Sequence, residues 1–230
     1  MVRSRFPSAL AAAARMGRLL AGLALCAIAL WLTVRVDLGL SPWDVLHSGI
    51  AARTGMPFGT VLIVVGGIVL VVAALLGERP GIGTPINIVL VGLTINELIE
   101  TPWLTGLTSA ATLPRMLVLV GAVALLGLGG AIYLSARLGA GPRDSLMVAC
   151  CARGLPVTLA RTGIELSVLA GGWLLGGRVG IGTVVLALGS GPAVALGFRL
   201  IGSSPVDNAT PVDDEHADED SASCGPALAA

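Results

Sequence analysis

The sequence predicts an all-α membrane protein with about six transmembrane helices, arranged as two inverted three-helix repeats that each carry a short interfacial or re-entrant helix. The prediction rests on composition, on the apolar stretches and on an internal duplication. The chain has 230 residues, of which 55% are hydrophobic and only 12% are charged. An average soluble domain carries about 25% charged residues. So little charge cannot cover a water-facing surface, which excludes an ordinary soluble enzyme and a disordered chain.

The distribution of charge also points to a bilayer. All 14 basic residues are arginines, and seven of the 14 acidic residues lie within residues 203–230. The arginines are spread between apolar segments, as membrane topology signals are, whereas a nucleic-acid-binding protein would gather them on one face. We therefore expect the lipid bilayer as a partner and no nucleic acid.

Six apolar stretches are long enough to be membrane helices. A helix needs about 20 apolar residues to cross a hydrocarbon core of about 30 Å. The stretches lie near residues 17–35, 58–76, 84–100, 116–136, 157–175 and 183–202.

The two halves of the chain repeat one another. Leu38-Gly39-x-x-Pro42-x-Asp44-x-Leu46 recurs 100 residues later, from Leu138 to Leu146. Leu75-Leu76-Gly77-x-Arg79-x-Gly81-Ile82-Gly83-Thr84 recurs 99 residues later, from Leu174 to Thr183. Low-complexity matching does not readily explain Pro, Asp, Arg and Thr in fixed register. The first apolar stretch is therefore one member of a repeated pair, and we expect it to be a retained helix rather than a cleaved signal peptide.

Each half also contains a segment too short to cross the membrane, at residues 42–54 and 142–154. Thirteen helical residues span only about 20 Å, so these segments should lie at the interface or enter the membrane and return. Three crossings per half is an odd number, so the halves should have opposite orientations, as in many secondary transporters.

These elements give the following organisation. We expect a cytoplasmic N-terminus (1–14), two membrane repeats (15–100 and 115–202) joined by a linker (101–114), and a disordered acidic tail (203–230). Placing both termini in the cytoplasm puts nine arginines in inside loops and four in outside loops, in weak agreement with the positive-inside rule.

The aspartates of the first motif have two compatible interpretations. Ser41 would cap a helix, Pro42 would occupy its first turn and Asp44 would satisfy free backbone N–H groups. Alternatively, Asp44 and its counterpart Asp144 present two carboxylates at a cavity, where they could bind a proton, a cation or a substrate amine.

The second motif is open in the same way. Gly81-Ile82-Gly83-Thr84 and Gly180-Ile181-Gly182-Thr183 would form tight turns, with Thr84 and Thr183 capping the helices that follow. The alternative is a broken helix whose N–H groups face an anionic ligand.

Ionisable groups inside the apolar stretches need a partner or a watery cavity, because a charge at the helix centre costs at least about 2.5–3.5 kcal/mol. Glu97 lies in the third stretch, within it or at its interfacial end. Glu165 and Arg161 lie four residues apart in the fifth and could form a self-satisfied pair. Four tryptophans lie near expected helix ends, as interface anchors do. The glycine pairs at 66–67, 129–130 and 171–172 predict close approach of helices.

We identify no catalytic, metal or cofactor site in the sequence. His47 has no second histidine near it, and no H-E-x-x-H, G-x-S-x-G or C-x-x-C motif occurs. The sequence therefore predicts a protein that is not an enzyme and carries no cofactor.

The two repeated motifs resemble a known family. Gly39-Leu40-Ser41-Pro42-Trp43-Asp44 followed by Gly81-Ile82-Gly83-Thr84 is similar to the YczE-like membrane proteins of bacteria, related to the YitT type, over about residues 15–200. The resemblance implies a multi-pass protein of the bacterial plasma membrane, without a well-established activity. The second copy has Gly141 for Ser41 and Arg143 for Trp43, so a two-fold symmetric site is in doubt.

The function that the sequence favours is a small secondary transporter or permease for an unknown small solute or ion. The expected site residues come from both halves and both motifs: Asp44, Asp144, Glu97, Glu165, Thr84 and Thr183. The alternative is a non-transporting accessory or regulatory protein that binds a partner through its tail or loops. A chain of this size raises the further expectation of a homodimer that encloses the pathway.

Overall fold

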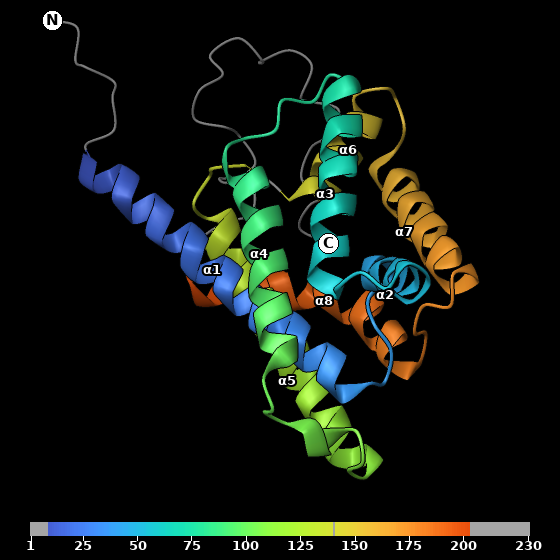
Figure 1. Ribbon diagram of the computed structural model, residues 1–230. Helices are drawn as coiled ribbons and strands as arrows, with labels where there is room; N and C mark the ends of the chain where they lie inside the picture. The colour runs from blue at the N-terminus through green and yellow to red at the C-terminus, as the bar shows by residue number, and fades with distance from the viewer. Residues whose placement is uncertain (1–8, 140, 203–230) are drawn as a thin grey trace, which may run out of the picture.

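The computed structural model describes residues 9–139 and 141–202, which form eight α-helices and one short 3-10 helix (Figure 1). The all-α part of the prediction is confirmed. The elements are α1 (Ala9–Val36), α2 (Pro42–Thr54), α3 (Phe58–Leu75), α4 (Gly83–Glu100), η1 (Thr105–Leu107), α5 (Thr112–Leu134), α6 (Pro142–Cys151), α7 (Val157–Leu174) and α8 (Ile181–Leu200).

All six expected spanning stretches are helices, but they are not equally apolar. Among the described residues, four helices are long and apolar enough to cross a membrane: α1, α3, α5 and α8. Helix α4 and helix α7 equal α3 in length. Two glutamates and two asparagines interrupt α4, and Arg161 and Glu165 interrupt α7, which lowers the hydropathy of both helices.

Several boundaries differ from those expected. Helix α1 begins at Ala9, inside the segment expected to be the cytoplasmic N-terminus. Residues 101–114 contain η1 and the first turn of α5 rather than a plain linker. The second short helix ends at Cys151, earlier than its counterpart at Thr54. The expected acidic tail, 203–230, lies outside the described residues.

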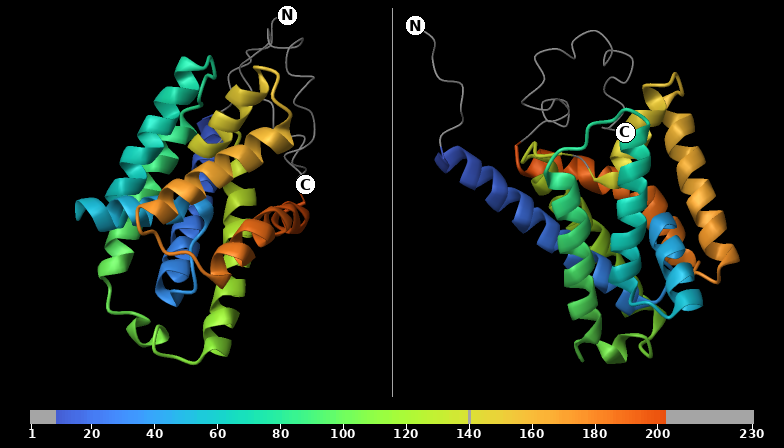
Figure 2. Two further views of the ribbon diagram at one scale, coloured as in Figure 1. Left: turned by 90° about the vertical axis from the view of Figure 1, so that its right-hand side faces the viewer. Right: turned by 45° about the horizontal axis from the view of Figure 1, so that its top comes forward.

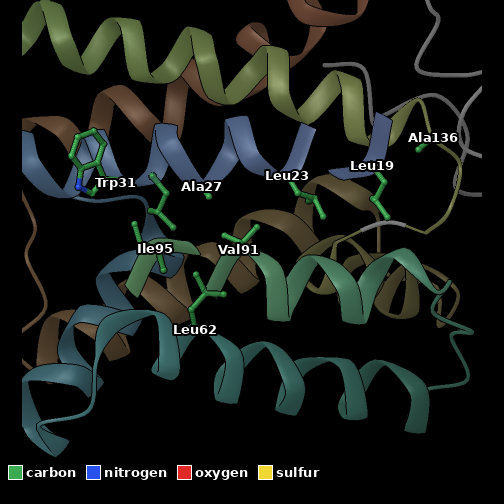
Figure 3. Packing of buried hydrophobic residues seen from close by; sticks show 9 residues of the cluster. Leu19, Leu23, Ala27, Trp31, Leu62, Val91, Ile95 and Ala136 are labelled. Carbon is green, nitrogen blue, oxygen red and sulfur yellow. The ribbon is translucent and has the colours of Figure 1, made fainter. Parts of the chain in front are cut away.

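The main apolar core lies between α1 and the pair α3–α4. Leu19, Leu23, Ala27 and Trp31 project from successive turns of α1 towards α4 and α3, where they meet Val91, Ile95 and Leu62 (Figure 3). Trp31 is only 6% exposed. It is therefore a core residue, and its expected role as an interface anchor is wrong.

Helices α1 and α5 pack against each other along much of their length and run antiparallel (Figures 1 and 2). At one end, Arg115 Nε at the start of α5 donates to the Val36 carbonyl at the end of α1, at 2.8 Å. Towards the other end, Gly22 of α1 lies against the backbone of Tyr133. A Cβ on Gly22 would lie 2.5 Å from the Tyr133 nitrogen, so glycine permits this close crossing.

Small residues allow other close crossings as well. A Cβ on Gly172 of α7 would lie 2.4 Å from the backbone nitrogen of Leu46 in α2, and one on Gly129 would lie 2.9 Å from the Gly22 carbonyl. These two positions confirm the expected close approach. Gly67, in contrast, has nothing within 4 Å, so the prediction fails there.

The two repeated motifs contact each other reciprocally between the halves of the chain. Gly83 N–H donates to the Leu138 carbonyl at 2.6 Å, and Gly182 N–H donates to the Leu38 carbonyl at 2.7 Å. Each Gly-Ile-Gly-Thr segment thus binds the loop that precedes the short helix of the other half.

The ends of the short helices are held in the same reciprocal way. Arg53, at the end of α2, donates from Nε to the Leu175 carbonyl after α7, at 3.2 Å. Arg153, just after α6, donates to the Leu76 carbonyl after α3. Figure 1 shows α2 almost along its axis, between α3 and α7, both of which it contacts.

Backbone conformations fall in pairs about 100 residues apart. Three pairs in the connecting loops have closely similar positive φ values: Asp37 and Arg137 (52° and 53°), Gly39 and Gly139 (114° and 124°), and Gly77 and Gly176 (87° and 91°). The loops before each short helix and after α3 and α7 therefore have matching turns.

Candidate functional site

The site begins at the first turn of α2, which forms as the sequence predicts. Ser41 is the N-cap in an extended conformation, Pro42 is the first helical residue, and the Asp44 N–H donates to Ser41 Oγ at 3.4 Å. The cap interpretation of this motif is thus confirmed. The group that caps the helix is the Ser41 hydroxyl, so the Asp44 carboxylate is available for other contacts.

The Asp44 carboxylate is buried and has three side-chain partners. The Ser41 hydroxyl donates to Oδ2. Nδ1 of His47, one turn further along α2, lies 3.3 Å from Oδ1. Arg143 of α6 also donates to Oδ1 at 3.3 Å, from the other half of the chain. Asp44 is 5% exposed and His47 is 3% exposed, so Asp44 and His47 lie inside the protein.

Arg143 also stacks on Trp43. Its guanidinium carbon lies 5.4 Å from the centre of the Trp43 ring, within the range of a cation–π contact. Trp43 and Arg143 occupy the same position in the two copies of the motif. The two copies have different residues there, and these two residues contact each other. The Arg143 side chain is 41% exposed, which makes it the accessible part of the cluster.

The second aspartate lies beside the first cluster. Asp144 is half-buried, and its Oδ2 and the hydroxyl of Tyr133 from α5 both lie beside Gly141, the N-cap of α6. Arg143, Arg161 and Glu165 all act on Asp144 electrostatically. The two short helices therefore bring both motif aspartates to one polar centre, which we define as Asp44, His47, Arg143 and Asp144.

The polar centre lies near the middle of α1 rather than at either end. The loop after α1 starts at Val36, beside Leu119 of α5, and the loop after α5 packs near Leu19 through Ala136. Between Leu19 and Val36 α1 rises by about 25 Å. Asp44 and Arg143 nevertheless meet, so both loops lead back towards the middle of α1. Gly141, the N-cap of α6, lies beside the Tyr133 hydroxyl, and the Tyr133 backbone crosses α1 at Gly22, between those two points.

The two threonines of the second motif have a different environment. Helix α4 begins at Gly83 and helix α8 at Ile181, so Thr84 and Thr183 stand inside the first turn and not at the N-cap position. Thr183 nevertheless caps α8 from its third position, as the sequence predicts. Thr183 Oγ1 accepts from the Gly180 N–H at 3.1 Å. Both threonines are buried against the loop glycines of the other half. They support the loops that lead to the polar centre.

The two candidate glutamates, Glu165 and Glu97, lie in different surroundings. Glu165 pairs with Arg161 in α7, with 3.4 Å between Oε1 and Nε, as its spacing predicts. It also belongs to the electrostatic environment of Asp144. Glu97 is an exposed residue near the end of α4 and has no ion pair within the described part of the chain. The structure does not bring it to the polar centre.

Sequence reasoning missed Arg143 and His47 of the polar centre, and Trp43 and Tyr133 beside it. A single histidine makes no metal site, but the spacing of His47 three residues after Asp44 predicts a contact on one helix face. Trp43 was expected to be an interface anchor and is instead 6% exposed. Tyr133 carries no signal in the sequence beyond being the single tyrosine.

Comparison with known proteins agrees with the apolar helices and the two motifs. Residues 13–198 match the family of unknown function DUF6198. The chain is 38% identical over 188 residues to an uncharacterized protein of Haemophilus influenzae, covering 81% of this chain and 84% of that one. It is 35% identical over 175 residues to the uncharacterized membrane protein YczE of Bacillus subtilis, covering 74% and 79%. No solved structure matches significantly. The apolar helices and the relatives together identify a membrane protein, and the chain belongs to the YczE-like family, DUF6198.

Proposed function

We propose that this protein is a small secondary transporter or permease of the bacterial plasma membrane. The observation that carries the proposal is the contact between Asp44 of α2 and Arg143 of α6 at the middle of a membrane-spanning helix. Buried ionisable groups within a membrane are costly and typically serve a substrate or ion pathway. The names of the relatives give no substrate, so the chemistry of the site must suggest one.

The proposal includes the inverted repeat. Helices α1 and α5 run antiparallel, and the contacts between the two motifs occur twice, once in each direction. An axis near Cys26 that lies in the membrane plane relates two such halves. This arrangement is the one in which many transporters place a binding site at the bilayer midplane.

The short helices are re-entrant in this proposal. Each is reached by a loop that starts at one end of the α1–α5 pair and returns to the middle, where Ser41 and Gly141 begin α2 and α6. Helix starts that meet at mid-depth carry partial positive charge and favour nearby carboxylates. This supports the ionised form of Asp44, which also pairs with Arg143.

The polar centre can exchange partners, which is what a transport site requires. Asp44 holds His47 and Arg143 at the same oxygen, so a proton or a cation on that carboxylate competes directly with the Arg143 contact. Asp144, with Glu165 nearby, supplies a second acidic position. We assign recognition or coupling to Asp44, Asp144 and Glu165, and a supporting role to Thr84 and Thr183. We propose no enzymatic activity.

Water access to the centre tests the proposal without knowledge of the substrate. Single cysteines replace Ser41 or Gly141 in a protein whose four native cysteines are alanine, and the purified protein in liposomes is treated with a membrane-impermeant thiol reagent. Ile95→Cys is the matched control, because Ile95 is fully buried in the apolar core.

If the protein is a transporter, we expect the reagent to modify Ser41→Cys or Gly141→Cys to a much greater extent than Ile95→Cys. If both cysteines at the centre react as little as the core control, no aqueous route reaches the site. The protein would then be a membrane accessory or regulatory protein, with Asp44 and Asp144 acting only in helix capping and packing.

A further inference from the structure

A second feature lies away from the polar centre, at one end of the helix bundle. Residues of the α1–α2 loop, the start of α5 and the α7–α8 loop surround an open pocket of about 570 Å³. Helix α1 ends there, whereas α5 and α8 begin there, and these three helices are membrane spans by length and composition. The pocket therefore lies at the depth of the lipid headgroups.

The charged groups of this pocket are two arginines and one aspartate. Arg115 donates to the Val36 and Asp37 carbonyls, and Arg178 Nη1 donates to Asp37 Oδ1 at 2.9 Å. The pocket thus has an excess of one positive charge. The Arg178 side chain is 53% exposed, and its other two guanidinium nitrogens make no hydrogen bond or ion pair within the described residues. Arg178 keeps donors for an anionic group.

An apolar groove continues from the pocket along the outer surface of α7. It has a volume of about 440 Å³ and is lined by Leu166, Leu169, Ala170, Trp173 and Val179. Trp173 and Val179 line both cavities, so the two are adjacent. Trp173 is 66% exposed and marks the boundary between the basic pocket and the apolar groove. Tryptophan is typical of that level in a membrane.

We propose that this surface binds an anionic phospholipid, with the phosphate of the headgroup at Arg178 and one acyl chain along the Trp173 groove. Three features fit this occupant together: headgroup depth, an excess positive charge with free donors, and an adjoining apolar groove of the outer helix surface. A soluble anion would have no use for the groove, and a zwitterionic lipid would gain nothing from the excess charge.

The other half of the chain provides a matched control. Arg79 stands at the position that corresponds to Arg178, and it is exposed. Ala74 stands where Trp173 does, so the corresponding loop lacks the aromatic boundary. Loss of Arg79 removes the same charge from the protein without touching the proposed site.

Quenching of tryptophan fluorescence by brominated lipid reads out this site directly. Trp173 and Trp103 are both 66% exposed, whereas Trp31 and Trp43 are 6% exposed, so Trp103→Phe leaves Trp173 as the exposed tryptophan. The full chain with this change is placed in phosphatidylcholine vesicles. Brominated phosphatidylglycerol or brominated phosphatidylcholine is then titrated in, and Trp103→Phe/Trp173→Phe gives the signal of the buried pair.

The proposal predicts half-maximal quenching of Trp173 at about five-fold lower content of brominated phosphatidylglycerol than of brominated phosphatidylcholine, which is the effect of about one basic side chain at a membrane surface. Arg178→Gln should remove this difference, and Arg79→Gln should keep it. Asp37→Asn should widen it, because the competing carboxylate is lost. Asp37→Asn also keeps the test informative if Arg178→Gln folds poorly.

Three results would overturn the proposal. The first is equal quenching by the two lipids in the Trp103→Phe protein. The second is a preference that survives Arg178→Gln or falls equally in Arg79→Gln, which would reflect general surface charge. The third is quenching unchanged by Trp173→Phe.

Discussion

Asp44 joins the two halves of the chain through a single carboxylate. Its backbone belongs to a helix cap, whereas its side chain binds Ser41, His47 and Arg143. Removing one member of a buried ion pair leaves the other charge without compensation, which costs more than the pair itself contributes. The exposed part of Arg143 reduces that cost, because water or headgroups can reach it.

Asp44→Asn tests this arrangement at the scale of one residue. The amide keeps the size of the side chain and removes its charge, so we expect the free energy of unfolding in detergent to fall by about 1–3 kcal/mol. Thermal unfolding followed by circular dichroism measures it. Glu97→Gln is the matched control, and it should stay within about 0.5 kcal/mol of the parent, because Glu97 is exposed. Equal effects of the two substitutions would contradict the role given to Asp44.

The sequence alone predicts one side of this site and not the other. Serine, proline and aspartate at positions 41, 42 and 44 specify a helix start by local rules, and the structure has that start. Arg143 is 99 residues away from Asp44, and no local rule pairs them. Glu97 is the converse case. Its sequence fits either a buried charge or a helix end, and the structure places it exposed near the end of α4, outside the centre.

Among the elements, the loops before α2 and α6 are the most constrained. Gly39 has a φ of 114°, and a Cβ there would lie 2.6 Å from the Gly180 nitrogen and 2.7 Å from Thr183 Oγ1. Gly139 has a φ of 124° and meets Gly81 and Thr84 in the same manner. The loop needs glycine both for its conformation and for the space occupied by the facing motif.

Gly39→Ala and Gly139→Ala should therefore each lower the free energy of unfolding by about 2–4 kcal/mol, from backbone strain and overpacking together. Chemical or thermal unfolding of the purified protein gives the value. Gly67→Ala is the control, because Gly67 is helical and has nothing within 4 Å, and it should change stability by no more than about 1 kcal/mol. A Gly39→Ala protein as stable as the Gly67→Ala protein would refute the close contact.

These contacts explain why the two motifs occur together in each half. The helix start at Ser41-Pro42 is the one that the sequence predicts, whereas the Gly-Ile-Gly-Thr segments lead into the first turns of α4 and α8 instead of forming separate tight turns. Their partnership is not local, because the Gly182 N–H binds the Leu38 carbonyl from the other half. Periodicity and turn rules describe each segment alone, whereas the contact depends on how the helices between the segments pack.

At the scale of the whole molecule, the account depends on two halves that enter the membrane in opposite directions. Composition predicts the membrane class, and the duplication predicts the two halves. Hydropathy identifies four of the six expected spans. It falls short for α4 and α7 because both contain polar residues, some of which bind other groups of the protein: Asn96 of α4, for example, accepts from the Gly59 N–H at 2.7 Å.

The most direct measurement of this claim is the sidedness of Arg79 and Arg178, which occupy corresponding loops of the two halves. Each is replaced by cysteine in the cysteine-free protein, and intact cells are labelled with an impermeant thiol reagent before and after permeabilisation. The account predicts that one of the two positions reacts in intact cells and the other reacts only after permeabilisation. Reaction of both positions from the same side would contradict the inverted arrangement and remove the basis for a transport site at the polar centre.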